Sequence, residues 1–85
     1  MEEKLIGKIT HYFNKIGVGV IEISEGKLKA GDKIHIKGAT TDFEQSVSSM
    51  QIEHETVEKA SAGQAIGMKV EQAVHEGDEV YKIEE

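Results

Sequence analysis

The chain has 85 residues, a formal net charge of −6 and no cysteine or proline. This length suits a single domain over residues 1–85 with one thin core, and the lack of cysteine excludes disulfides and thiolate metal sites. The acidic start and the absence of any apolar run near the roughly 20 residues of a membrane helix predict a cytoplasmic protein with no signal peptide and no membrane partner.

Charge is divided unevenly along the chain. Residues 1–39 carry a balance of +2, and residues 40–85 carry −8. An acidic chain repels phosphate backbones on average, which counts against non-specific nucleic-acid binding. The asymmetry either orients the domain on a charged partner or reflects two solvated faces.

The first half of the chain predicts three strands. Residues 5–13 alternate, with Leu5, Ile9 and Phe13 on one side, and Phe13 is expected in the core. The Gly-rich run 17–23 is apolar on both faces, which predicts a strand covered on both sides. In the third strand, 32–37, Ile34 and Ile36 point inward.

The second half predicts three more strands. Residues 42–55 form a long run whose phase changes, because Val47 and Met50 both belong inward; this predicts a bulge or bend near Ser48 and Ser49. Residues 57–60 are too short for more than a turn or bridge. The runs 64–70 and 78–83 complete an all-β domain without a helix.

Glycines mark the turns between these runs. Gly31, Gly63 and Gly77 each precede a polar residue and then a strand, and Gly26 ends the second run. Glycine can adopt the positive φ that such turns need, and the polar side chain can accept a hydrogen bond from a free backbone N–H. We interpret these four glycines as structural turn residues.

Several of these pieces together resemble a known family. The order of Gly7-Lys8-Ile9, the Gly-rich strand 17–20, the turn 26–34, the element 62–67 and the closing 77–80 resembles domain 2 of translation elongation factor Tu and its GTPase relatives. The resemblance covers about residues 5–83 and implies a closed six-stranded β-barrel. The chain also resembles stand-alone elongation-factor-like small proteins, and it is similar to the C-terminal barrel of collagenase-like peptidase proteins linked to tRNA modification.

The chain departs from the elongation factors at the pocket for the aminoacylated tRNA end. An acid and an Asn of that pocket align with Gln51 and Ala65, so neither side chain is kept. The GTPase domain is absent from the sequence. The resemblance therefore implies a binding role in translation, but it does not imply recognition of the tRNA end.

The sequence offers no catalytic residues. No phosphate-binding loop is present, because Gly7-Lys8 and Gly26-Lys27 are not followed by Ser or Thr; we expect no GTP binding and no cofactor. No serine lies in a nucleophile elbow. The group Glu53-His54-Glu55 lacks a second histidine at metal-ligand spacing, so no metal site is predicted.

A binding surface remains as the candidate site. The cations of the stretch 27–37 lie in what the pattern suggests is a hairpin, and three of them share one strand face: Lys27, Lys29, Lys33, His35 and Lys37. They either contact phosphates or an acidic protein, or they protect a sheet edge from aggregation. No aromatic residue is interleaved with them to stack on bases.

Two functions follow from these observations. In the first, the domain is a non-catalytic module that binds RNA, tRNA or the ribosome in translation or tRNA-related processes. In the second, it docks on a larger protein, such as a collagenase-like peptidase family protein. The basic stretch and the resemblance favour RNA, whereas the acidic net charge and the lack of stacking residues favour protein docking.

Overall fold

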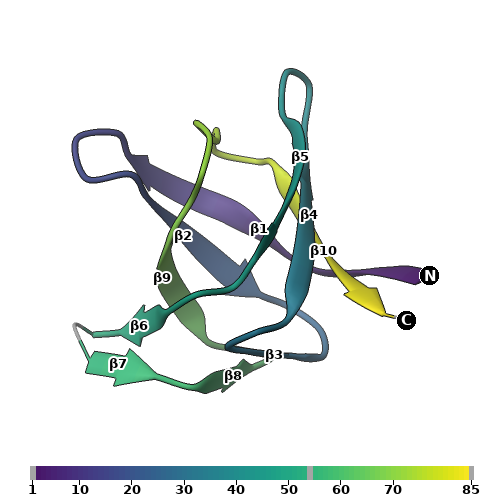
Figure 1. Ribbon diagram of the computed structural model, residues 1–85, viewed down its shortest axis with the longest axis vertical. Coiled ribbons are helices and arrows are strands. Elements are labelled where there is room, and N and C mark those ends of the chain that lie inside the picture. Colours follow the sequence, from purple (N-terminus) through teal and green to yellow (C-terminus); the bar gives the residue numbers. More distant parts are fainter. Residues whose placement is uncertain (1, 54, 85) are drawn as a thin grey trace.

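The computed structural model describes residues 2–53 and 55–84, and these form ten strands and no helix (Figure 1). No membrane-spanning helix exists in that part of the chain. The strands are β1 (Glu2–Phe13), β2 (Val18–Ile23), β3 (Lys27–Lys29), β4 (Lys33–Lys37), β5 (Asp42–Ser46), β6 (Met50–Ile52), β7 (Glu55–Val57), β8 (Lys59–Ser61), β9 (Ala65–Lys69) and β10 (Glu79–Glu84).

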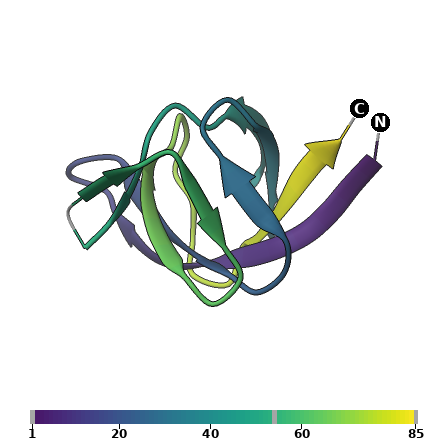
Figure 2. The ribbon, with the colours of Figure 1, turned by 90° about the horizontal axis from the view of Figure 1, so that it is seen from below.

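Eight of these strands form one antiparallel sheet. Their order is β5-β4-β10-β1-β2-β9-β6-β7, and the other two strands form a separate β3–β8 ribbon. The sheet curls strongly (Figures 1 and 2), because its end strand β5 continues along the chain into β6 near the opposite end. The all-β prediction is confirmed.

The predicted closed barrel of six strands is not what forms. The hydrogen-bonded ladder stops at β5 and at β7, so the sheet is curled but not closed. The physical reason lies after Val47, which still bonds to the backbone of Asp32 and Gly31: the next two residues, 48–49, belong to no strand, and β5 pairs with neither β6 nor β7. The bend expected at Ser48 and Ser49 is therefore present, with Val47 and Met50 both buried on its two sides.

A buried side chain bridges the two ends of the curled sheet. Gln45 of β5 is only 5% exposed, and its amide donates to the backbone oxygen of Lys69 at 3.0 Å and accepts from the N–H of Glu71 at 2.9 Å. These bonds join β5 to the end of β9. A side-chain amide thus replaces ladder bonds at this seam.

The β3–β8 ribbon covers one end of the core. Leu28 and Ala60 lie opposite each other in the ribbon and are both buried. Backbone bonds join the turn after the ribbon to β2 of the sheet, from Gly63 N–H to Ile23 O and from Ile23 N–H to Gln64 O. The sequence prediction missed β3, β7 and β8, because three-residue strands are too short to show alternation.

The first strand differs from its predicted facing. Register shifts occur between Leu5 and Gly7 and between Ile9 and His11. As a result Ile6 and Ile9 are both buried, whereas Leu5 is 39% exposed and Phe13 is 46% exposed. The expectation that Phe13 belongs to the core is wrong, since each bulge moves the following residues to the opposite face.

The core itself is almost entirely aliphatic. The fully buried side chains come from β1, β2, β4, β6, β9 and β10 of the sheet, from β3 of the ribbon and from two connecting segments: Ile9, Ile21, Ile23, Leu28, Ile34, Ile36, Val47, Met50, Ile66, Met68, Val74 and Val80. The inward alternation predicted in strands 32–37 and 64–70 is confirmed by this set.

The predicted turn chemistry is also confirmed. Gly26, Gly31, Gly63 and Gly77 all have φ between +73° and +96°. After three of these glycines the polar side chain accepts from the backbone N–H three residues earlier, at 2.8–2.9 Å: Asp32 from Lys29, Gln64 from Ser61 and Asp78 from His75. One local motif therefore shapes three separate turns.

Candidate functional site

The row of cations on β4 faces outward as predicted. Lys33, His35 and Lys37 alternate with the fully buried Ile34 and Ile36. However, β4 lies inside the sheet between β5 and β10. These cations therefore do not protect an edge strand.

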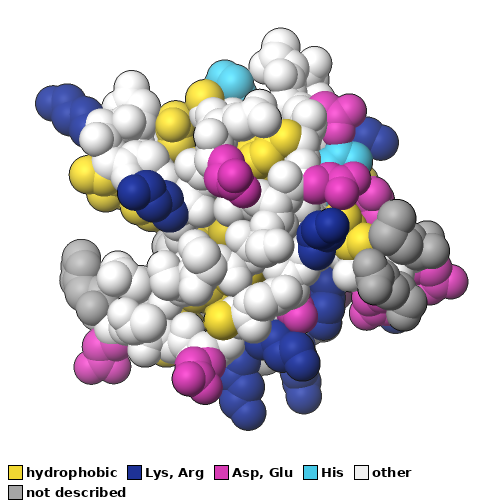
Figure 3. Space-filling view, in the orientation of Figure 1, with side chains coloured by type: hydrophobic (Ala, Val, Ile, Leu, Met, Phe, Trp, Pro, Cys, Tyr) yellow, Lys and Arg dark blue, Asp and Glu magenta, His cyan; other side chains and the backbone are white. Residues whose placement is uncertain are grey.

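The other two predicted cations lie on a different element. Lys27 and Lys29 belong to β3, which pairs with β8 and not with β4, so the expected hairpin over 27–37 does not exist. Lys29 stands opposite Lys59 in the ribbon. Lysine side chains gather at the lower end of the molecule, over this ribbon (Figure 3). The five predicted binding residues thus divide between two surfaces.

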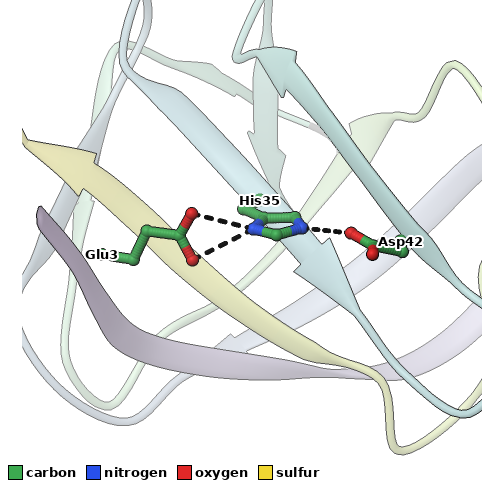
Figure 4. A network of polar contacts seen from close by, with 3 residues as sticks. All are labelled: Glu3, His35 and Asp42. Atoms are coloured by element: carbon green, nitrogen blue, oxygen red, sulfur yellow. Dashed lines mark hydrogen bonds and ion pairs between the residues drawn. The ribbon is translucent and has the colours of Figure 1, made fainter. Parts of the chain in front are cut away.

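The middle of the β4 row is not a basic surface. Both ring nitrogens of His35 contact carboxylates (Figure 4): Nδ1 lies 3.0 Å from both carboxylate oxygens of Glu3, and Nε2 hydrogen-bonds to Asp42. The three residues come from β4, β1 and β5, respectively. The His35 side chain is only 12% exposed, so it is largely enclosed by these acids and its neighbouring strands.

The two carboxylates favour the charged form of the imidazole. The hydrogen bond to Asp42 raises the pKa of His35 above 6.5; partial desolvation opposes this, and the bond to Glu3 adds to it. The same bond from His35 lowers the pKa of Asp42 below 3.8. Protonated His35 therefore neutralises part of the acidic surface contributed by β1 and β5.

A further acid completes this cluster. Glu44 lies directly opposite His35 in the β4–β5 pairing. Ligand atoms of Glu3, His35 and Glu44 all lie within 4.8 Å of one another. The sequence analysis missed this set because Glu3 and His35 are 32 positions apart and meet only across the sheet.

A second histidine has polar neighbours but no accessible nucleophile. His75 Nδ1 lies 3.2 Å from the Thr41 hydroxyl and 3.8 Å from Asp78, so both partners approach the same ring nitrogen. A triad needs the nucleophile and the acid on opposite nitrogens. Thr41 is also only 4% exposed, so it is not accessible as a nucleophile.

The sequence predicted no metal site at Glu53-His54-Glu55. That prediction depends on His54, which lies outside the described residues.

An apolar surface lies on the outer face of β1, β2 and β9. Across the β1–β2 pairing His11 is opposite Val20 and Phe13 is opposite Val18, and across β2–β9 Val20 is opposite Gly67. We call these residues, together with Ile16 in the connecting turn, the outer apolar face. The rings of His11 and Phe13 pack at 4.4 Å.

This face explains why β2 is apolar on both sides. Gly19 and Ile21 point into the core, whereas Val18 and Val20 point outward and are half-buried. Ile16 is 63% exposed at the turn, and apolar side chains appear beside the hairpin tip in Figure 3. The predicted cover on both sides of this strand is absent from the described chain.

The two positions aligned with the elongation-factor pocket are surface residues. Gln51 of β6 and Ala65 of β9 are both exposed. Gln51 pairs with Gly67, and Ala65 pairs with Glu22. These positions therefore lie on the outer surface of the sheet.

Curated relatives of the chain are peptidase-family proteins. It is 43% identical over 81 residues to an uncharacterized protease of Methanocaldococcus jannaschii, covering 94% of this chain and 20% of that protein. It is 38% identical over 84 residues to a collagenase of Porphyromonas gingivalis, covering 98% of this chain and 23% of that protein. The chain thus spans about a fifth of the length of the curated relatives that it matches. No family model matches the chain.

A solved structure shares the fold. The C-terminal domain of a Geobacillus thermoleovorans protein described as a U32 peptidase superposes with a TM-score of 0.87 over 95% of this chain and 93% of that domain. The sequence identity is 17%, so this likeness concerns the fold. The relatives and the solved domain named here are peptidase-family proteins, and none is an elongation factor.

Proposed function

We propose that this chain is a non-catalytic docking domain for the larger part of a collagenase-like peptidase protein. The observation that carries the proposal is the outer apolar face, which no described element covers. A small domain rarely leaves an apolar strand face, a phenylalanine and an isoleucine together on its surface unless a partner covers them.

The geometry of this face suits protein contact. Phe13 and Ile16 project at the tip of the β1–β2 hairpin, 46% and 63% exposed, and Val18 and Val20 extend the apolar surface along β2. Gly67 has no side chain, and a Cβ at this position would lie 3.5 Å from Val18 Cγ1. Lys69 lies directly opposite Val18 and borders the face. An aromatic anchor beside two valines with a cation at their border resembles the apolar centre and polar rim of an interface.

The occupant is argued from the relatives. The chain corresponds to about a fifth of each of them, so four fifths of such a protein remains to supply a complementary surface. Interfaces between domains typically bury about 600–1,500 Å². We propose a non-catalytic role because His35 contacts acids, His75 contacts a buried hydroxyl and an acid, and His11 packs on Phe13, so no described histidine contacts an activated nucleophile.

A binding measurement tests the proposal. The protein would be titrated against the M. jannaschii relative from which the matching segment has been deleted, with calorimetry as the readout. We expect saturable binding that a Phe13→Ser, Ile16→Ser double variant weakens at least tenfold, because it removes the aromatic anchor. A Lys33→Ser, Lys37→Ser variant on β4 serves as the matched control and should bind normally.

Two outcomes would overturn the proposal. If the protein binds neither the truncated relative nor a similarly truncated P. gingivalis collagenase, the proposed partner is wrong. If wild type and the Phe13, Ile16 variant bind equally, the proposed binding surface is wrong. Circular dichroism of both variants would establish that each is folded.

The RNA-binding function draws no support from these relatives. The predicted cations divide between β3 and β4, and the β4 cations are interrupted by the acids around His35. A role in translation would therefore need evidence from a direct binding experiment.

A further inference from the structure

The acids around His35 form a second candidate binding site, which is independent of the outer apolar face. Glu3, His35 and Glu44 come from β1, β4 and β5 and offer one ligand atom each within 4.8 Å of the others. We propose that these three side chains bind one divalent transition-metal ion, with Zn²⁺ as the probe.

The ligand types fit such an ion. Zn²⁺ accepts imidazole nitrogen and carboxylate oxygen at about 2.0–2.2 Å, which places two tetrahedral ligands roughly 3.3 Å apart. His35 Nδ1 and the Glu3 oxygens are already 3.0 Å apart. Glu44 is exposed and directly opposite His35, so a side-chain rotation can bring its carboxylate to the ion.

A second observation concerns the other nitrogen of the ring. His35 Nε2 is held by Asp42 on β5. In protein metal sites a ligating histidine almost always donates its remaining N–H to a carboxylate or carbonyl, which fixes the ring and its tautomer. Asp42 thus orients the imidazole so that Nδ1 faces Glu3, the side on which the ion would lie.

The charge balance also favours a cation. Three acids, Glu3, Asp42 and Glu44, lie around one imidazole, while Lys33 and Lys37 lie two residues away on the same face of β4. Without metal, a proton on His35 offsets part of this negative charge. Metal binding would displace the proton from Nδ1 and bring two positive charges to the same place.

Three protein ligands leave a fourth position for water, as in an open zinc site. The structural effect would be to tie the start of β1 to β4 and β5. β4 and β5 are consecutive along the chain, but β1 is distant from both, and β10 lies between β1 and β4 in the sheet. The ion would therefore link β1 to β4 and β5 across the intervening strand β10.

Calorimetric titration of the metal-free protein with ZnCl₂ at pH 7.5 in a non-chelating buffer tests this site. We expect one ion per chain. His35→Asn should weaken binding at least a hundredfold, and Glu3→Gln and Glu44→Gln should each weaken it at least tenfold. Asp42→Asn should weaken it by about 10- to 100-fold, because it acts on the ring and not on the ion.

His75→Asn is the matched control, because the His75 side chain is 63% exposed and lies outside both the cluster and the outer apolar face. It should bind Zn²⁺ as the wild type does. The visible absorption of Co²⁺ gives a second readout, with a tetrahedral spectrum expected from wild type and lost in His35→Asn. Circular dichroism would establish that each variant is folded.

Absence of saturable 1:1 binding below about 100 μM Zn²⁺ would overturn the proposal, as would unchanged binding by His35→Asn. Unchanged binding by both glutamate variants would also overturn it, since the ion would then lie elsewhere. None of these outcomes bears on the docking face.

Discussion

At the scale of single residues, the positive-φ glycines determine the turns. Gly31 and Gly77 have φ of +96° and +92°, and a Cβ at either position would meet no atom within 4 Å. Any cost of substitution therefore comes from the backbone and not from a clash. We predict that Gly31→Val and Gly77→Val each lose about 1–2 kcal/mol of unfolding free energy, because β-branched residues tolerate positive φ poorly.

Chemical denaturation measures this loss. Gly67→Ala is the matched control, because Gly67 lies in a strand without positive φ and its added Cβ would only contact Val18 at 3.5 Å. Unchanged denaturation midpoints for both valine variants would show that these turns can adopt another conformation.

Protonation of His35 gives a prediction for stability against pH. Its folded pKa is raised above 6.5, so its contribution is complete below that value and is lost as the pH rises through the folded pKa. The folded pKa of Asp42 is lowered below 3.8, so its contribution is lost only as the pH falls through that lower value. The pair should stabilise most between about pH 4 and 6.5.

Thermal unfolding across pH 5–9 in the presence of a metal chelator tests this. The difference in Tm between wild type and His35→Gln should be largest near pH 5–6 and should shrink as the pH rises. A difference that stays constant across this range would show that the imidazole acts only by packing.

At the scale of elements, Gln45 holds the seam of the curled sheet. It is 5% exposed and makes two bonds to the backbone at the end of β9. We predict that Gln45→Met lowers the unfolding free energy by about 1–3 kcal/mol, because it leaves a backbone oxygen and an N–H without partners. Gln51→Met, at an exposed glutamine of β6, should change it by less than about 0.5 kcal/mol. Equal effects of the two changes in urea denaturation would contradict this role.

The elements also show what could be predicted from the sequence. Alternation located the strands that contain Ile34 and Ile66, and the phase change between Val47 and Met50 located the bend, because burial of one face imposes a two-residue period. The bulges in β1 have no comparable signal, so Phe13 was placed on the wrong face. The short strands β3 and β8 are stabilised by each other, which no local pattern reveals.

The candidate sites were less predictable for the same reason. That Lys33, His35 and Lys37 share a face follows from alternation alone. That Glu3 and Asp42 enclose His35 depends on the order of strands in the sheet. The apolar character of β2 was visible in the sequence, but its open outer side required the structure.

At the scale of the whole molecule, the distribution of charge determines which partners it can approach. The net charge is −6, so a nucleic acid meets long-range repulsion unless cations gather on one surface. The predicted cations do not share one surface, since Lys27 and Lys29 lie on the β3–β8 ribbon, whereas Lys33 and Lys37 lie on β4 beside the acids that hold His35. We therefore predict no salt-sensitive binding of tRNA.

Fluorescence anisotropy with labelled tRNA at 50 and 200 mM salt measures this. If all four lysines neutralised phosphates together, the log–log salt slope would be roughly −3 to −4. A slope in that range, lost in a Lys33→Glu, Lys37→Glu variant that remains folded by circular dichroism, would restore the RNA-binding function. Loss only in a Lys27→Glu, Lys29→Glu variant would instead assign binding to the ribbon. We expect neither result. The predicted cations lie on two surfaces and acids surround His35, so too few positive charges can face one phosphate backbone at the same time.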